Sequence, residues 1–185
     1  MEIIAHRGAS GYAPENTRAS ILKGLELDCD GFEIDVQLTN LGEIVVFHDF
    51  SLERITSQKS YIKDENLQDL KKMDIGSWFS KEFKGEKIMT LEELLDLIPK
   101  NKILNIEIKV RHNEKNQIEK KVIEILKNKK RIEGKIIISS FNHSIIKNIN
   151  KLEPKLKTGL LLTAGILNIE DYIKINNLKI YSIHS

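Results

Sequence analysis

Three carboxylates stand where neighbouring strands could bring them together. Glu33 and Asp35 are two residues apart in a strand-like run, so both side chains point to the same face. Glu107 lies in a later run, 105–109, in which a polar or charged residue again occupies every second position. A single acidic residue is usually solvated, but a carboxylate pair on a core-facing strand is costly to bury without a partner. Carboxylates without a thiolate form a hard oxygen site, so we predict one bound Mg²⁺ or Ca²⁺ rather than structural zinc.

Two histidines end apolar runs that lead towards the same place. His6 follows Ile3-Ile4-Ala5, and His48 follows Ile44-Val45-Val46-Phe47. Asn40-Leu41-Gly42 is typical of a tight turn, and a two-residue loop there would place Glu33 opposite His48, within one register step. A lone histidine is more often structural, but two imidazoles that titrate near neutral pH suit a general acid and a general base.

Two basic residues beside these groups indicate which reaction the site could catalyse. Arg7 follows His6 directly and carries a planar fork that matches phosphate oxygens, and Lys109 closes the run that contains Glu107. A metal ion, fixed cations and an acid/base pair are together suited to phosphoryl transfer, which requires mainly positioning and charge neutralisation.

Strand-like and helix-like patterns alternate along most of the chain, which favours parallel strands joined by helices. The predicted strands are 3–6, 31–38, 44–48, 103–109, 135–139, 157–162 and 178–183, and the predicted helices are 16–27, 91–98, 118–126, 145–152 and 169–175. The helix at 91–98 has the clearest limits, because Thr90 and Glu93 form a capping-box pattern and Pro99 stops it.

The segment at about 50–89 interrupts this alternation. It is polar, contains one weakly amphipathic stretch around Leu67, Leu70 and Met73, and holds the only tryptophan, Trp78. Long insertions often overhang a binding site, so we predict a cap. A surface excursion with Trp78 as a packing anchor fits the same pattern.

Composition limits the classes of protein to consider. The chain of 185 residues has 41% hydrophobic and 30% charged residues and a net charge of +2, which is typical of one globular domain over 1–185 and gives no support to nucleic-acid binding. No apolar stretch approaches the ~18–20 residues of a membrane span, and the start of the chain has no leader pattern. A cytoplasmic protein is the default expectation.

The motifs, taken in order, resemble the glycerophosphodiester phosphodiesterase family. The resemblance rests on His6-Arg7-Gly8, Pro14-Glu15-Asn16-Thr17, Glu33-Ile34-Asp35-Val36-Gln37-Leu38-Thr39, Val45-Val46-Phe47-His48-Asp49 and Asn105-Ile106-Glu107-Ile108-Lys109. It implies an α/β fold of the TIM (β/α)8-barrel type and hydrolysis of glycerophosphodiesters to glycerol 3-phosphate and an alcohol.

The resemblance also implies roles for individual residues. The metal ligands would be Glu33, Asp35 and Glu107, the acid/base pair His6 and His48, and the phosphate contacts Arg7 and Lys109, with Glu15 as a partner that holds Arg7. Which histidine is the acid stays open at this point, as does direct attack by water against a cyclic phosphate intermediate.

The chain departs from the family pattern in two places. Leu41 stands where family members usually have an aspartate, a change on a loop. More importantly, a TIM barrel takes ~250 residues, and only six barrel strands can be counted after the return strand at 44–48 is set aside. We therefore expect a barrel without its last two β/α units, incomplete at its C-terminal end, with open edges that could self-associate. The alternatives are a related barrel phosphodiesterase acting on lysophospholipids and a catalytically inactive truncated remnant.

Overall fold

A curved parallel sheet forms the centre of the molecule. The computed structural model describes residues 1–111, 114 and 116–184. Six parallel strands follow one another in the order β1-β2-β4-β5-β6-β7, and β3 pairs with β2 outside this path. The parallel strands are β1 (Ile4–His6), β2 (Gly31–Leu38), β4 (Ile103–Ile108), β5 (Ile136–Ser140), β6 (Lys157–Leu161) and β7 (Ser182–His184), and the antiparallel one is β3 (Ile44–Val46). The six barrel strands counted in the sequence are therefore all present in the described part of the chain.

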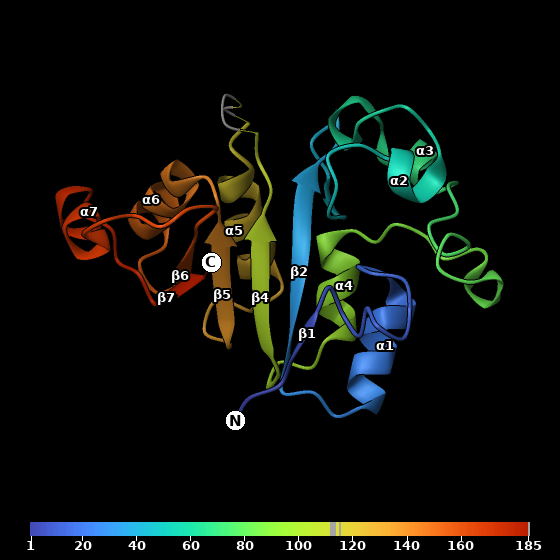
Figure 1. The fold of residues 1–185 in the computed structure, drawn as a ribbon, viewed down its shortest axis with the longest axis horizontal. Helices are drawn as coiled ribbons and strands as arrows, with labels where there is room; N and C mark the ends of the chain where they lie inside the picture. Colours follow the sequence, from blue (N-terminus) through green and yellow to red (C-terminus); the bar gives the residue numbers. More distant parts are fainter. Residues whose placement is uncertain (112–113, 115, 185) are drawn as a thin grey trace.

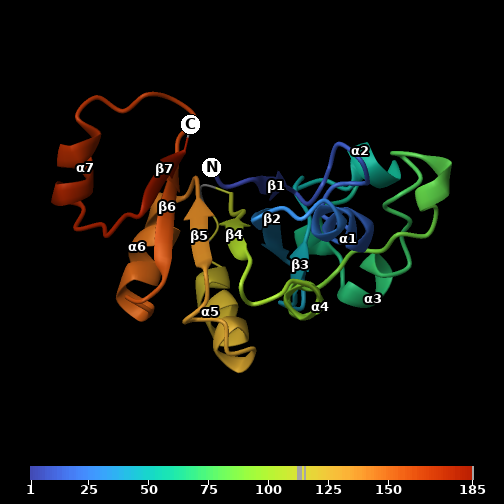
Figure 2. The ribbon, with the colours of Figure 1, turned by 90° about the horizontal axis from the view of Figure 1, so that it is seen from below.

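Helices connect the parallel strands and lie outside the sheet. They are α1 (Arg18–Glu26), α4 (Leu91–Leu97), α5 (Ile118–Asn128), α6 (His143–Leu152) and α7 (Ile169–Ile175). Figure 2 shows the strands as an arc with these helices around its outer side, which is the arrangement of an open TIM-like barrel. Among the described residues, β1 pairs only with β2 and β7 pairs only with β6, so both edges of the arc are free.

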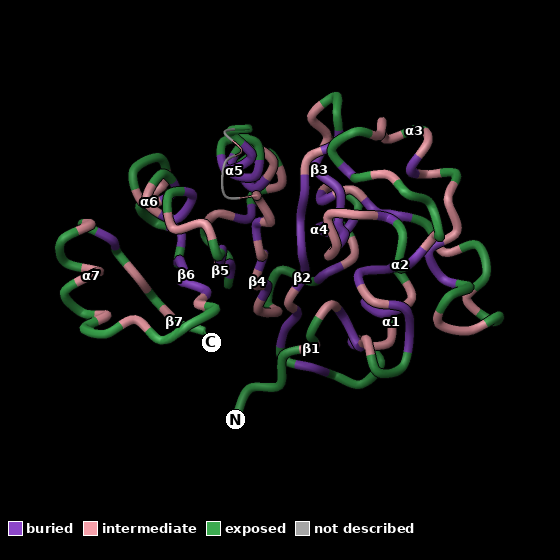
Figure 3. Tube along the Cα trace, turned by 45° about the horizontal axis from the view of Figure 1, so that its top comes forward, coloured by how far each residue is buried: buried purple, intermediate pink, exposed green. Residues whose placement is uncertain are grey.

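The main core fills the space between the sheet and the helices. Alternate residues along β2 and along β4 are buried in this core. These residues are Phe32, Ile34 and Val36 on β2, and Leu104, Ile106 and Ile108 on β4. Figure 3 shows the resulting buried stretches along the central strands. Because side chains alternate along a strand, the residues between these positions project to the concave side of the arc. The apolar face of the sheet is therefore covered by the helices, and the concave face is left for polar groups.

Local sequence signals explain where two helices begin. Thr90 and Glu93 form the expected capping box at α4, and Thr17 forms a second one with Ser20 at α1. The prediction of a helix from residue 16 was two residues too long at its start, because Asn16 has a φ of 58° and lies outside α1.

The loop of the β2–β3 hairpin is one residue longer than the two-residue loop predicted at Asn40-Leu41. Val36 pairs with Val46 and Leu38 with Ile44, and the amide of Thr39 donates to the carbonyl of Glu43 at 3.0 Å. Gly42 adopts a φ of +87° and belongs to the turn, so the loop has three residues. The shift stays within the one-step margin of the prediction.

The predicted strand at 178–183 begins too early in the sequence, because β7 begins at Ser182. Leu178 instead packs with Ile146 and Leu160.

Residues 50–89 form an insertion beside β2: Figure 1 shows α2 and α3 beyond the end of this strand and the later part of the segment returning towards α4. Their short elements are α2 (Glu53–Thr56), η1 (Ile62–Asp64), α3 (Leu67–Leu70) and η2 (Lys81–Phe83). Leu52, Ile62 and Leu70 are fully buried in a small apolar cluster that also contains Val45 and Phe47. The interpretation of this segment as a cap on a single domain stays a prediction.

No helix in the described part of the chain combines the length and the apolar character that crossing a membrane requires.

Candidate active site

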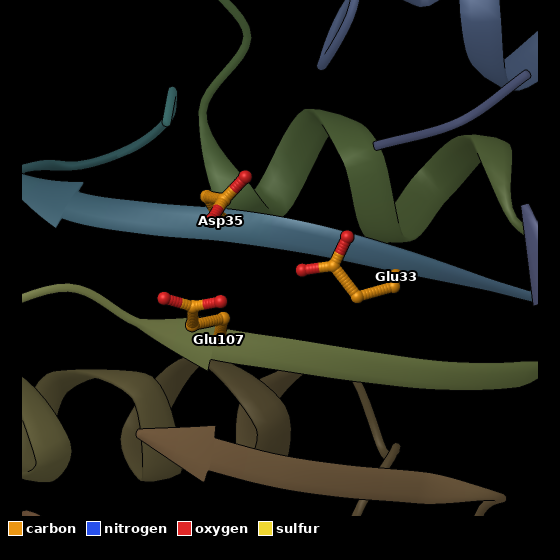
Figure 4. A group of neighbouring side chains, drawn as sticks. All are labelled: Glu33, Asp35 and Glu107. Atoms are coloured by element: carbon orange, nitrogen blue, oxygen red, sulfur yellow. The ribbon is translucent and has the colours of Figure 1, made fainter. Parts of the chain in front are cut away.

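The three predicted metal ligands meet between β2 and β4. The parallel register places Asp35 beside Glu107, and Glu33 lies one side-chain repeat earlier on β2. One carboxylate oxygen from each of the three residues lies within 4.8 Å of the others. Figure 4 shows the three side chains gathered at the facing edges of the two strands. The sequence therefore predicted this cluster, including the contribution from a distant strand.

Asp35 is the most enclosed of the three. Its Oδ2 accepts a hydrogen bond from Asn16 Nδ2 at 2.9 Å, while the Asp35 amide donates to Asn16 Oδ1 at 3.3 Å. Its Oδ1 is buried and accepts no hydrogen bond from the residues described, although Lys109 Nζ lies 3.6 Å away. A buried carboxylate oxygen without a donor is costly, so this atom fits a ligand that supplies positive charge.

Glu33 shows the same shortage of positive charge. Burial, together with the neighbouring Asp35 and Glu107 carboxylates, raises the pKa of Glu33 to about 8 against the opposing hydrogen bond from the Arg7 backbone amide. That amide donates to Glu33 Oε2 at 3.1 Å. The oxygen-only donor set and the strained charge balance both fit a divalent cation of the Mg²⁺ or Ca²⁺ type.

The turn after β1 positions Arg7. Arg7 has a φ of 54° and Gly8 a φ of 78°, and the Arg7 carbonyl accepts from the Asn16 amide at 2.8 Å. A Cβ at Gly8 would lie 2.3 Å from Ser20 Oγ and 2.9 Å from the Ser20 backbone carbon, so only glycine fits. The Arg7 side chain reaches back to Glu15 at 3.2 Å and to Asp35 Oδ2 at 3.6 Å.

Lys109 and His6 border the carboxylates from two strands. Lys109 Nζ donates to Glu107 Oε1 at 2.9 Å, and its side chain is only 11% exposed. His6 Nε2 lies 3.7 Å from Glu33 Oε2, and the His6 side chain is 68% exposed. Burial lowers the pKa of His6, and the Arg7 and His48 charges lower it further against the attraction of Asp35.

His48 contacts a carboxylate other than the predicted ones. Its Nδ1 lies 2.6 Å from Asp49 Oδ1, and Gln37 Nε2 donates to the His48 carbonyl at 3.3 Å and to the Asp49 carbonyl at 2.8 Å. The hairpin brings the backbone before His48 next to β2, where the Phe47 amide donates to the Asp35 carbonyl at 3.0 Å. The role of His48 at the carboxylate cluster stays a prediction. The two histidines are close enough for the charge of His48 to affect the pKa of His6.

A chain of ion pairs links the two halves of the site. Arg54 Nε donates to Asp49 Oδ2 at 2.5 Å, and Arg54 Nη2 donates to Glu15 Oε1 at 2.6 Å. Partial burial raises the pKa of Asp49, but the hydrogen bonds from Arg54 and His48 outweigh it, so the pKa lies below its usual value. Asp49 thereby stays ionised beside His48, and Glu15 contacts both Arg54 and Arg7.

Comparison with known proteins identifies the family. A model of the glycerophosphoryl diester phosphodiesterase family matches residues 6–180. The chain belongs to this family. A glycerophosphodiester phosphodiesterase of Caldanaerobacter subterraneus subsp. tengcongensis is 42% identical over 183 residues, which are 98% of this chain and 74% of that protein. One of Bacillus subtilis is 34% identical over 97% of this chain and 66% of its own length.

Solved structures of the family share this fold. An Oleispira antarctica phosphodiesterase in complex with the product sn-glycerol-3-phosphate superposes with a TM-score of 0.89 at 32% identity, over 96% of this chain and 72% of that one. The present chain thus spans about 72% of a family structure, and its six parallel strands form an open barrel.

Three residues around the family motifs escaped the sequence-based assignment of roles. Asn16 and Asp49 belong to the quoted motifs, but only the fold shows that Asn16 hydrogen-bonds Asp35 and that Asp49 hydrogen-bonds His48. Arg54 lies in the insertion, and no pattern in the sequence marks it. Its partners come from loops up to 39 residues away along the chain.

Proposed function

We propose that this chain hydrolyses glycerophosphodiesters to glycerol 3-phosphate and an alcohol with the help of one divalent cation. Membership of the family supports the reaction class. The observation that carries the proposal further is the carboxylate cluster, in which the buried Asp35 Oδ1 accepts no hydrogen bond from the described residues. A bound cation would supply this oxygen with a partner, and a cation at this point would face the groups suited to bind a phosphate.

Glu33, Asp35 and Glu107 would hold the cation. When bound, it would supply Lewis-acid polarisation of the phosphate and ease ionisation of the attacking hydroxyl. The three carboxylates and the two cations Arg7 and Lys109 sum to one negative charge. A divalent ion and a phosphodiester monoanion together would bring the sum to neutrality, which favours binding of both.

Arg7 and Lys109 bind the phosphate oxygens in this proposal. Both already lie 3.6 Å from Asp35, so they flank the place where the phosphate must approach the cation. Glu15 holds the Arg7 guanidinium from the other side at 3.2 Å. A guanidinium that is oriented in advance loses less side-chain freedom when it binds phosphate.

His6 and His48 act as the acid/base pair. The lowered pKa of His6 keeps its imidazole neutral, and therefore able to accept a proton, to lower pH than an ordinary histidine. Asp49 accepts from His48 Nδ1, which fixes the ring and leaves Nε2 for proton transfer at the substrate. Proton removal from the attacking hydroxyl and proton delivery to the departing alkoxide are the two transfers that the reaction requires.

The experiment is turnover of glycerophosphocholine by this 185-residue chain with Mg²⁺ or Ca²⁺, with glycerol 3-phosphate measured as the product. A parallel assay uses lysophosphatidylcholine at the same concentration. Release of glycerol 3-phosphate from the first substrate supports the proposal. Turnover of the lysophospholipid alone would assign the chain to the rival class, and turnover of neither would mean that the chain is an inactive member of its family.

A further inference from the structure

A cleft of about 440 Å³ begins at Lys109 and runs away from the carboxylates. Its walls come from the turn after β2, from the insertion and from the described residues after β4. Four cations line it, namely Lys63, Lys109, Arg111 and Lys121, against one described carboxylate, Glu114. The cleft therefore carries an excess of positive charge next to the proposed phosphate site.

Arg111 is the cation in this cleft that is most suited to a ligand. Lys63 pairs with Glu114 at 3.3 Å, Lys109 pairs with Glu107 at 2.9 Å, and Lys121 donates to the Gly42 carbonyl at 2.6 Å. Arg111 has no carboxylate within ion-pair distance in the part of the chain that the structure describes. Its guanidinium donates no hydrogen bond to another described side chain or carbonyl, which leaves these donors for an anion.

Two aromatic rings of the insertion hold the Arg111 guanidinium. Its central carbon lies 4.5 Å from the centre of the Tyr61 ring and 5.1 Å from that of Phe50. Such contacts orient the planar fork while leaving its edge free to donate hydrogen bonds. An arginine that is charged, oriented and without an ionic partner is suited to a phosphate, which accepts two parallel hydrogen bonds.

The spacing along the chain connects Arg111 to the reaction. Lys109 and Arg111 are two residues apart, so their Cα atoms lie at most ~7 Å apart. Lys109 contacts the proposed scissile phosphate, and its amide still continues the β2–β4 ladder by donating to the Val36 carbonyl at 3.0 Å. A second phosphate separated from the first by a short polyol would meet Arg111 while the first one lies against Lys109.

From these contacts we infer that the cleft is a subsite for a second phosphate group on the alcohol part of the substrate. The preferred substrates are then glycerophosphodiesters whose alcohol is itself phosphorylated. The inference rests on the proposed function for the scissile phosphate, and it gives the insertion a role in selecting substrates through Phe50 and Tyr61.

The test compares two substrates that differ only in this group: glycerophosphoglycerol, and glycerophosphoglycerol with a phosphate on its terminal hydroxyl. For the wild-type chain, we expect a higher kcat/KM for the phosphorylated diester, mainly through KM. Arg111→Leu should lower kcat/KM for the phosphorylated diester at least fivefold more than for the other, and Arg111→Lys should recover part of the loss. Arg18→Leu, on the exposed start of α1, is the matched control and should not change the ratio.

Equal loss on both substrates, or no loss on either, would overturn the subsite. Isothermal titration with glycerol 1,3-bisphosphate separates this outcome from failure of the proposed function. If neither diester is hydrolysed but Arg111→Leu still weakens binding of the bisphosphate at least fivefold, the proposed function fails and the subsite stands. If wild type and Arg111→Leu bind the bisphosphate equally, the subsite is wrong whatever the activity.

Discussion

At the scale of single residues, the carboxylates of the site outnumber the basic side chains that contact them. Asp35 Oδ1 is buried without a donor, and the pKa of Glu33 is raised to about 8 by burial and by the Asp35 and Glu107 charges. These two observations come from different residues and agree. The carboxylate spacing at 33 and 35 could be found from the sequence because strand side chains alternate.

Arg54 could not be found in this way. Its guanidinium joins Asp49 and Glu15 through space, at 2.5 and 2.6 Å, and thereby connects the His48 loop with the Arg7 loop. Such a contact depends on how the insertion folds back towards residue 15, and no periodicity or motif encodes it. Positions that follow from strand alternation could be predicted, whereas contacts that depend on packing between loops could not.

Replacement of either histidine should remove most of the activity. We expect His6→Ala and His48→Ala each to lower kcat by about 10²-fold or more, the usual loss for a positioned acid or base. The double variant should lose less than the product of the two single losses, because both residues serve one step. Steady-state kinetics alongside circular dichroism tests this, and near-normal turnover by either folded variant would leave that histidine a structural role.

Glu33 should make the stability of the metal-free chain depend on pH. Its pKa is higher in the folded state, about 8, than the usual 4.5, so the folded state binds the proton more tightly between these values. The free energy of unfolding should therefore fall as pH rises from about 4.5 to 8, and Glu33→Gln should weaken this dependence. Urea unfolding with a chelator at pH 5 and pH 8 measures it.

Glu124→Gln provides the control for that experiment, since Glu124 is exposed on α5. It should keep the pH dependence of the wild type. The same slope in Glu33→Gln as in the wild type would show that Glu33 has no raised pKa.

At the scale of elements, short backbone features position the site more than the long helices do. The turn after β1 presents Arg7, the three-residue turn after β2 sets the hairpin register, and the end of β4 presents Lys109. The sequence predicted the helices and strands well because their apolar periodicity is clear. It left the hairpin register open by one step, and the structure takes the longer loop because Gly42, at a φ of +87°, belongs to the turn.

Gly8→Ala tests the turn that presents Arg7. A methyl group there would meet Ser20 Oγ at 2.3 Å and would stand at a φ of +78°, so we expect a loss of roughly 1–3 kcal/mol in unfolding free energy. Gly11→Ala is the control, because a Cβ at Gly11 has no neighbour within 4 Å and should change stability little. Urea titrations of both variants decide it, and equal stabilities would contradict the steric argument.

At the scale of the whole molecule, the arc of six strands has two edges that pair with no other described strand. β1 and β7 lie on the open side, near the two ends of the chain in Figure 2. Exposed apolar side chains accompany them, with Ile4 at 39% and Ile183 at 46% exposure. The strand count could be predicted from the alternating pattern, but the curvature that brings these edges near one another follows from sheet twist and helix packing.

We expect the isolated 185-residue chain to self-associate through these edges. Unpaired strand edges with exposed apolar residues favour pairing with another chain. Light scattering over a range of concentrations should show a mass that rises with concentration, and the pair Ile4→Lys and Ile183→Lys should reduce the rise. Lys substitutions at the exposed Leu22 and Leu152, on helices, provide the control. A monodisperse monomer at all concentrations would show that the open edges are protected.

The most direct test of metal-dependent phosphodiester hydrolysis is the rate of glycerol 3-phosphate release from glycerophosphocholine, measured on this chain before and after chelation. We expect excess chelator to abolish the rate and Mg²⁺ or Ca²⁺ to restore it. Asp35→Asn should stay inactive after the metal is returned, because the amide removes a ligand charge without changing the size of the side chain. Full activity in excess chelator, or full activity of Asp35→Asn, would contradict the assignment of Glu33, Asp35 and Glu107 as a metal site that the reaction requires.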